Sequence, residues 1–384
     1  MSEQSTPVAA AASAKSSQRP AGYRIQLDGL RAVAVTATVI HHWVPDAIFW
    51  KTWFPFGVAG VRLFFVLSGF LITSILLDQR FAVESGEQDR ATSLGHFFLR
   101  RVMRLVPAFY LFLLVGSALD IGAIRDTVLW HIPYLSNLGM ILDGRWLPSI
   151  THLWSLAVEE QFYIAWAFLM LWLPRGAILP CIGLSIVAAP VFRTLGVALG
   201  WADMTISFNP ISCLDTLGMG ALLAVLWRGD VHARATSYRE RFVRVSLIVG
   251  LPLLLVTIVG QKLAGEAFRR SVAIPIQESA MAMVFTWLVA RATVGFGGPA
   301  GRFFANPLVV RLGVMSYAVY LFHPAVANAV MRWFSVGWSY WPTVGFSAFL
   351  TLSLAWLSWE FLEEPARKYG RRFAYVERTP KPAE

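Results

Sequence analysis

Charged residues are scarce in this chain: only 15% of its 384 residues are Asp, Glu, Lys or Arg. Hydrophobic residues make up 56%, and the mean hydropathy is +0.56. Soluble proteins of this length do not have such a composition, whereas membrane proteins with several spans do. The longest polar stretches, residues 78–96 and 120–152, are too short to form an independent core. The sequence therefore predicts an all-α polytopic membrane protein without a separate soluble domain.

Several common site signatures are also missing. The chain has no P-loop, no HExxH and no paired CxxC, which argues against a nucleotide hydrolase and a zinc enzyme. Its two cysteines, Cys181 and Cys213, lie within or beside apolar segments and are interpreted as buried thiols. The net charge of +10 is spread between apolar segments and forms no single basic patch. We therefore expect no metal cofactor and no nucleic-acid partner.

Apolar segments of membrane length recur along the chain. We predict about ten transmembrane helices, at residues 27–44, 57–77, 98–119, 157–173, 177–199, 212–228, 245–260, 272–290, 312–333 and 343–361. With both termini cytoplasmic, 24 of the 33 Lys and Arg residues lie on the inner side and 9 on the outer side, as the positive-inside rule requires. Residues 1–24 and 369–384 are then cytoplasmic tails, the first one flexible, around a membrane domain at 25–368.

Arg31 and His42 lie in one apolar run, with ten residues between them. Eleven helical steps amount to three turns plus roughly 20°, so both side chains share a face about 16 Å apart along the axis. Such residues are costly inside a membrane helix and are therefore functional candidates. The alternative is a snorkelling arginine and a hydrogen-bonded structural histidine. In the predicted topology Arg31 is near the cytoplasm, where a guanidinium can hold phosphate, and His42 lies deeper.

A second cluster, Arg100, Arg101 and Arg104, crowds the cytoplasmic start of the third predicted segment. Like charges this close repel one another unless an anion or carboxylates compensate them. We therefore predict that they bind phosphate. The alternative is that they only set the topology of the helix.

A third cluster lies in HLWSLAVEEQFY, where a polar outer loop meets the fourth segment. His152 and Glu159 are seven residues apart and share one helical face. Glu159 can orient a histidine and raise its basicity, or it can be a carboxylate in water at the membrane interface. In the ninth segment, SYAVYLFHP contains Tyr317 and His323. His323 is either a second group at the acceptor site or a residue with a structural hydrogen bond.

These strings resemble the acyltransferase-3 family of bacterial integral membrane O-acyltransferases. LDGLRAVAV with a following histidine, GVRLFFVLSGFLI, FFLRRVMRLVP, HLWSLAVEEQFY, SYAVYLFH and FLEEPAR occur in the family's order, between Leu27 and Lys368. In the family an arginine or lysine is followed after ten residues by a histidine, which selects Arg31 and His42. Arg62 departs from the pattern, because the family often has an aspartate there, and no role is carried over to it.

The resemblance implies transfer of an acyl group, usually acetyl, from cytoplasmic acyl-CoA to a hydroxyl of an extracytoplasmic or lipid-linked glycan, in the bacterial inner membrane. The implied catalytic residues are His42, Glu159 and Arg31. The implied donor-binding residues are Arg31, Arg100, Arg101 and Arg104. The expected substrate-binding residues are His152, Trp154, Tyr163, Tyr317 and His323. The expected partners are membrane lipid, acyl-CoA and the hydroxyl acceptor.

Two other functions remain compatible with the sequence. One is the same chemistry on a small metabolite such as a macrolide. The other is transport or flipping of a glycan or lipid, which ten helices with intramembrane charges also fit. Transport does not explain the spacing of Arg31 and His42 together with three arginines on the same side. If the chain is an enzyme, His42 acts as a general base or accepts the acyl group transiently.

Overall fold

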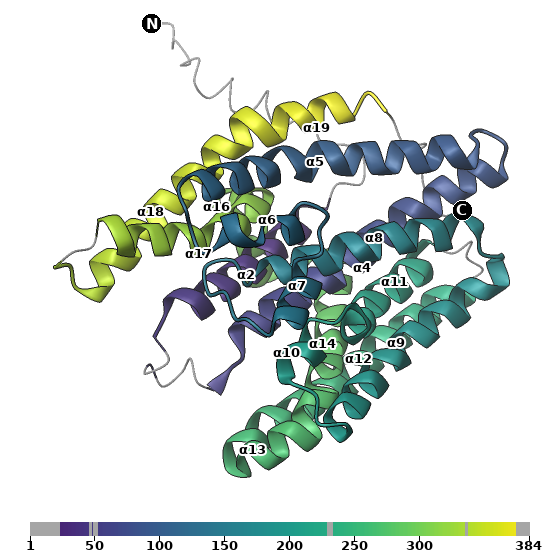
Figure 1. Ribbon diagram of the computed structural model, residues 1–384. Helices are drawn as coiled ribbons and strands as arrows, with labels where there is room; N and C mark the ends of the chain where they lie inside the picture. The colour runs from purple at the N-terminus through teal and green to yellow at the C-terminus, as the bar shows by residue number, and fades with distance from the viewer. Residues whose placement is uncertain (1–23, 46–47, 49–52, 229–232, 335–336, 374–384) are drawn as a thin grey trace, which may run out of the picture.

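The computed structural model describes residues 24–45, 48, 53–228, 233–334 and 337–373, and all regular structure in these ranges is helical (Figure 1). The predicted tails, residues 1–24 and 369–384, lie mostly outside these ranges. The main helices are α2 (Ile25–Trp43), α4 (Phe56–Glu84), α5 (Arg90–Ala118), α8 (Leu153–Trp172), α9 (Arg175–Ala198), α11 (Leu214–Arg228), α12 (Ala233–Leu263), α14 (Ile274–Val294), α17 (Ser316–Trp333) and α18 (Tyr340–Ser358). The shorter elements are α6 (Ile124–His131), α7 (Ser136–Asp143), α10 (Asp203–Ser207), η2 (Pro210–Cys213), α13 (Gly265–Phe268), η3 (Arg269–Ala273), α15 (Gly298–Phe304), α16 (Pro307–Val314), η4 (Trp359–Glu363) and α19 (Glu364–Gly370).

The all-α prediction is confirmed, and the chain is a multi-pass membrane protein. Among the described residues, six helices are long and apolar enough to cross a membrane. They are Phe56–Glu84, Arg175–Ala198, Pro210–Arg228, Ser237–Leu263, Gly265–Val294 and Tyr340–Gly370. α16 and α17, bent by 71°, make a seventh if they count as one span. By length and composition, the described residues therefore contain six or seven candidate spans, compared with the ten predicted. Helices α2, α5 and α8 cover predicted spans but are not in this set, and they carry the charged residues of the predicted site.

Helix α4 lies at the centre of the molecule and packs against α2, α8, α11 and α14 (Figure 1). Its closest approach is to α11, where a Cβ built on Gly69 would lie 2.0 Å from the carbonyl oxygen of Leu217. No residue with a side chain fits there, and small residues are what allow membrane helices to approach so closely. A Cβ on Gly313 would likewise lie 1.8 Å from the carbonyl oxygen of Asp28, so α16 presses on α2.

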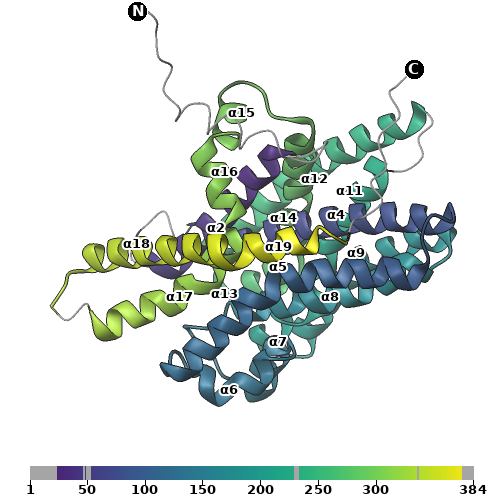
Figure 2. The ribbon, with the colours of Figure 1, turned by 90° about the horizontal axis from the view of Figure 1, so that it is seen from above.

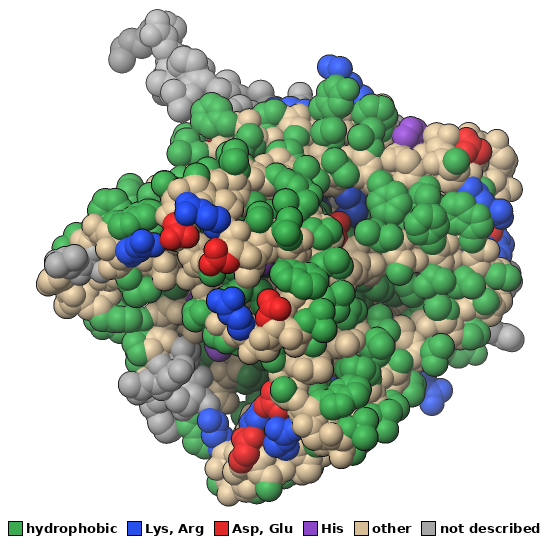
Figure 3. Space-filling view, viewed as in Figure 1, with side chains coloured by type: hydrophobic (Ala, Val, Ile, Leu, Met, Phe, Trp, Pro, Cys, Tyr) green, Lys and Arg blue, Asp and Glu red, His purple; other side chains and the backbone are tan. Residues whose placement is uncertain are grey.

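Helix α19 lies alongside α5, although the two are far apart in the sequence (Figure 2). α18 continues through η4 into α19, and only 22% of the most apolar window of this long helix is buried. Hydrophobic side chains cover much of the face seen in Figure 3, with charged groups in small clusters between them. Such a surface is suited to lipid contact. The packing of α19 on α5 brings Arg367 close to Arg104.

The loop between α5 and α8 is ordered by two short helices, α6 and α7. The amide nitrogen of Gln161 on α8 donates to the carbonyl of Tyr134 at 2.9 Å and to Asn137 at 2.9 Å. Within the loop, the ring of His131 lies 2.9 Å from the hydroxyl of Thr127 and 2.7 Å from that of Ser136. Burial lowers the pKa of His131 to about 4, because a charged imidazole is poorly solvated there.

A buried ion cluster joins α4, α9, α11 and α14. Arg62 pairs with Glu278 at 2.6 Å, and Arg193 pairs with Asp215 at 2.7 Å and with Glu278 at 3.3 Å. Arg62 and Arg193 are both 1% exposed. Two cations and two carboxylates therefore compensate one another, which is what burial of charge requires.

Both cysteines are free thiols. Cys213 is buried as predicted, and a guanidinium nitrogen of Arg62 donates to its sulfur at 2.9 Å. The prediction for Cys181 was wrong in part, because this thiol is only partly buried. α9 leaves much of its surface uncovered, since only 28% of its most apolar window is buried.

Candidate active site

The last turn of α2 brings His42 into contact with α17. Its Nδ1 atom lies 2.7 Å from Nε2 of His323. The neighbouring Trp43 donates from its indole nitrogen to the carbonyl of His323 at 3.1 Å. His323 is completely buried, whereas His42 is exposed. The end of α2 is therefore fixed to α17 at the residue that carries the candidate catalytic imidazole.

A third histidine, His152, stands at the N-terminus of α8 beside this pair. Its ring centroid lies 5.4 Å from that of His323, and its Nε2 donates to the carbonyl of Leu321 at 3.0 Å. The other nitrogen, Nδ1, is buried and has no hydrogen-bond partner among the described residues. Tyr320 adjoins the group, with its hydroxyl 2.6 Å from that of Ser155. Two histidines predicted for the acceptor site are thus brought together with His42, and His152 keeps one acceptor atom unused.

Arginines from three helices gather about three turns of helix away from His42. Arg31 pairs with Asp28 at 2.8 Å and is 20% exposed. Arg104 on α5 lies close enough to Arg31, Arg101 and Arg367 to experience their charges. Arg367 comes from α19 and is not among the arginines that the sequence predicts to bind the donor. The structure brings it there through the packing of α19 on α5.

Carboxylates of the described residues lie beside this arginine cluster. Glu160 lies near Arg101 and Arg104, and Glu363 lies near Arg104 and Arg367. Asp28 pairs with Arg31 as well, so the described carboxylates lie among guanidinium groups from three helices, and such a group of guanidiniums suits an anionic ligand. The remaining predicted arginine, Arg100, is half-buried on α5 where the end of α19 packs.

Glu159 is a residue of α8, and its side chain contacts α4. Its Oε1 atom accepts hydrogen bonds from the hydroxyl of Ser68 and, at 2.8 Å, from the hydroxyl of Tyr163. The Tyr163 ring in turn carries the guanidinium of Arg101, 3.6 Å above its centroid. These contacts connect Glu159 to Arg101 through the side chain of Tyr163. The ring nitrogen that lies against Nδ1 of His42, in contrast, belongs to His323.

The other predicted substrate-binding residues have contacts with neighbouring elements. Trp154 stacks on Phe208, with ring centroids 4.7 Å apart. The hydroxyl of Tyr317 donates to the carbonyl of Leu105 at 3.0 Å, which links α17 to α5. Substrate binding by either residue stays a prediction.

The site has two levels, and two helices give the same spacing between them. On α2, His42 and Arg31 are eleven residues apart, and on α8, His152 and Tyr163 are also eleven residues apart. Eleven residues of helix correspond to about 16 Å. A histidine level, with His42, His152 and His323, thus lies about 16 Å from the arginine level. In the part of the chain that the structure describes, no group of three or more His, Cys, Asp or Glu residues could hold a metal ion.

Comparison with known proteins shows the family of the chain. The model of an acyltransferase domain, Acyl_transf_3, matches residues 24–360. A Staphylococcus aureus (strain MSSA476) protein named "Putative O-acetyltransferase" is 29% identical over 376 residues, which cover 91% of this chain and 58% of that protein. Peptidoglycan O-acetyltransferase OatA of Listeria monocytogenes is 28% identical over 374 residues, covering 91% and 56%. O-acetyltransferase OatA of S. aureus (strain NCTC 8325) is 27% identical over 371 residues.

The chain spans just over half the length of these relatives. No solved structure matches it. The family model, however, covers α2 to α18 and so includes the three histidines and the arginines of α2 and α5, whereas Arg367 lies beyond the matched residues. The chain therefore belongs to the acyltransferase-3 (Acyl_transf_3) family.

Proposed function

We propose that this protein transfers an acetyl group from cytoplasmic acetyl-CoA to a hydroxyl of an extracytoplasmic or lipid-linked glycan. The observation that carries the proposal is the pairing of an exposed, oriented His42 with an arginine cluster about 16 Å away. An extended coenzyme A arm has its phosphates at one end and its thioester at the other. A Listeria relative named for peptidoglycan O-acetylation makes a glycan the preferred acceptor.

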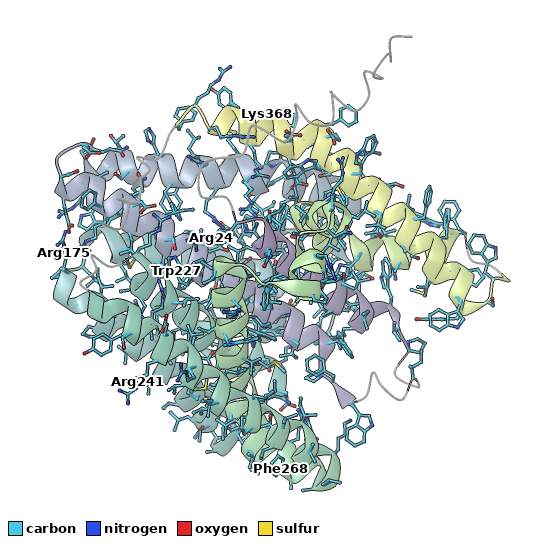
Figure 4. The ribbon with its side chains drawn as sticks, turned by 180° about the vertical axis from the view of Figure 1, so that it is seen from behind. Arg24, Arg175, Trp227, Arg241, Phe268 and Lys368 are labelled. Carbon is cyan, nitrogen blue, oxygen red and sulfur yellow. The ribbon has the colours of Figure 1, made fainter. Side chains whose placement is uncertain are left out.

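The proposed topology has ten spans with both termini in the cytoplasm of a bacterial inner membrane. The distribution of Lys and Arg supports it, with 24 on the inner side and 9 on the outer side. Figure 4 supports it as well, because Lys368 and Phe268 lie near opposite ends of the molecule. Lys368 belongs to the proposed inner side, and Phe268 belongs to a proposed outer loop. The arginine level then faces the cytoplasmic donor.

His42 carries out the chemistry in this proposal. As a general base, it takes the proton of the acceptor hydroxyl while the hydroxyl oxygen attacks the thioester carbonyl. A C–O bond forms, the C–S bond breaks, and coenzyme A leaves as a thiolate that then takes up the proton. In the alternative route His42 holds the acetyl group transiently before the hydroxyl attacks. Arg31, Arg101, Arg104 and Arg367 hold the donor phosphates and so align the thioester with His42.

Glu159 fits a place beside the donor arm. It is seven residues from His152, about 10 Å along α8, and therefore lies between the histidine and arginine levels. Ser68 and Tyr163 both donate to Oε1, and Oε2 has no hydrogen-bond partner among the described residues. The arm of coenzyme A carries amide N–H groups that need acceptors. We assign Glu159 to accept from one of them.

The decisive experiment uses purified protein, labelled acetyl-CoA and a panel of acceptors: peptidoglycan fragments, other oligosaccharides and a macrolide. Release of coenzyme A and product mass are measured. We expect acetylated glycan with the wild-type protein and none with His42→Ala. The matched control is His41→Ala, which removes the exposed neighbouring histidine and is expected to stay active. Full activity of His42→Ala would refute the proposal, and acetylation of the macrolide alone would refute the glycan acceptor.

A further inference from the structure

The dipeptide His323–Pro324 leaves a backbone carbonyl free within α17. A proline has no N–H, so the carbonyl four residues earlier loses its helical hydrogen bond. For Pro324 that carbonyl belongs to Tyr320. The Nδ1 atom of His323 lies 2.8 Å from it and 3.2 Å from the carbonyl of Val319. Since carbonyl oxygens only accept hydrogen bonds, Nδ1 of His323 carries a proton.

The proton on Nδ1 determines what the opposite nitrogen of His323 can do. In a neutral imidazole only one nitrogen is protonated, so Nε2 of His323 is an acceptor. The contact at 2.7 Å with Nδ1 of His42 then requires His42 to donate. The reverse arrangement would make the completely buried His323 a cation, and an isolated buried charge is far costlier than a neutral ring.

We propose that His323 is a positioning residue that holds His42 in the tautomer protonated at Nδ1, so that Nε2 is the unprotonated nitrogen that acts on the acceptor hydroxyl. The inference rests on the proposed function of His42. It identifies the reacting nitrogen as Nε2 in both the general-base and the nucleophilic route. In other sites a carboxylate sets the tautomer of the histidine beside it. Here a neutral imidazole, held by backbone carbonyls, does so.

The other contacts of the two rings fit this assignment. Trp43 donates to the carbonyl of His323 and so fixes the distance between α2 and α17 without using a ring nitrogen. His152 directs its own N–H to Leu321, so this donor is directed away from the pair. Rotation of the His42 ring is therefore opposed by one specific hydrogen bond.

Two variants of His323 separate the positioning role from a purely structural one. Asparagine places its amide where Nδ1 lies, so it can keep the bond to the Tyr320 carbonyl but cannot reach His42. Glutamine places an amide oxygen where Nε2 lies, so it can still accept from His42. We expect His323→Gln to keep kcat within about threefold of wild type. We expect His323→Asn to lower kcat about tenfold with an unchanged donor KM, as the loss of one hydrogen bond to the reacting group predicts.

A measurement independent of activity is the 15N NMR spectrum of histidine-labelled protein, with His42 assigned by comparison with His42→Ala. Wild type should show His42 protonated at Nδ1, and His323→Asn should show a mixture of tautomers. Equal kcat values for the two variants, or a wild-type His42 protonated at Nε2, would overturn the inference while leaving the proposed function intact. Activity of His42→Ala would instead refute the proposed function itself.

Discussion

Arg62 of α4 and Glu278 of α14 form an ion pair of 2.6 Å in which the arginine is almost completely buried. Glu278 also accepts from Arg193, which in turn holds Asp215. Each charge in this cluster is therefore balanced by charges from other helices. The position where the family often has an aspartate is occupied here by a cation whose role in the fold is to join α4 to α14.

Removing the Arg62 side chain should destabilise the protein strongly, because Glu278 and Asp215 would then share only Arg193. We expect Arg62→Ala to lower the free energy of unfolding by about 3 kcal/mol, the scale seen when one partner of a buried ion pair is removed. Unfolding in detergent with increasing denaturant measures it. The control is Arg228→Ala, which breaks an exposed pair with Asp78 and should cost less than about 1 kcal/mol. Equal losses in both variants would contradict the role of the cluster.

Acidification should loosen the loop that contains α6 and α7. The pKa of His131 falls from 6.5 to about 4 in the folded protein, so the unfolded chain binds the proton more tightly. The stabilisation is therefore complete above pH 6.5 and is lost as the pH falls toward 4. At pH 5 the loss amounts to about 2 kcal/mol. We expect Tm to fall between pH 7 and pH 5 in wild type and to fall less in His131→Gln. The same decrease in both proteins would exclude His131 as the cause.

Arg367 is expected to bind the donor even though it lies in the last described helix. Arg367→Ala should raise the KM for acetyl-CoA about tenfold, because a charge-assisted contact to phosphate is lost, and should leave kcat nearly unchanged. The neighbouring Lys368→Ala is the matched control, since its ammonium is exposed and pairs with Glu364 at 3.2 Å. Steady-state kinetics with varied acetyl-CoA distinguishes the two. An unchanged KM in Arg367→Ala would remove this residue from the donor site.

Glu159→Gln should discriminate between donors of different length. If the carboxylate accepts from the coenzyme A arm, the variant raises KM about tenfold for acetyl-CoA. It should have little effect with S-acetyl-N-acetylcysteamine, which lacks most of the arm. Binding of coenzyme A compared with that of 3′,5′-ADP, by equilibrium dialysis, provides a readout without turnover. A fall in kcat by the same factor with both donors would instead indicate that Glu159 acts on His42.

Local patterns in the sequence predicted much of the site, because its main elements are single helices. The spacing of Arg31 and His42 needs only helical geometry, and the three arginines of α5 lie within five residues of sequence. The contact of His42 with His323 joins residues 281 apart and depends on how α2 and α17 pack. The position of Arg367 beside Arg104 likewise depends on the packing of α19 on α5. Spacing within one segment carries no information about such packing, although the missing N–H of Pro324 was a readable signal for the bond made by His323.

The span count shows a related limit. Hydropathy identifies six or seven candidate crossing helices, and the long helices α2, α5 and α8, which carry His42, Glu159 and most of the site arginines, are outside that set. A membrane helix that supplies charged side chains to a site is less apolar as a result. These three helices were therefore recognised as parts of the site by their motifs and not by their hydropathy.

Gly69 follows Ser68 directly and abuts the carbonyl of Leu217. An alanine there would push α11 away from α4 and shift the hydroxyl that holds Glu159. We therefore expect evolution to conserve a glycine at position 69, because one added methyl group would disturb both the packing of α4 on α11 and the proposed donor contact of Glu159. Adaptation to a new acceptor must begin elsewhere in the site, and variation among relatives should concentrate there.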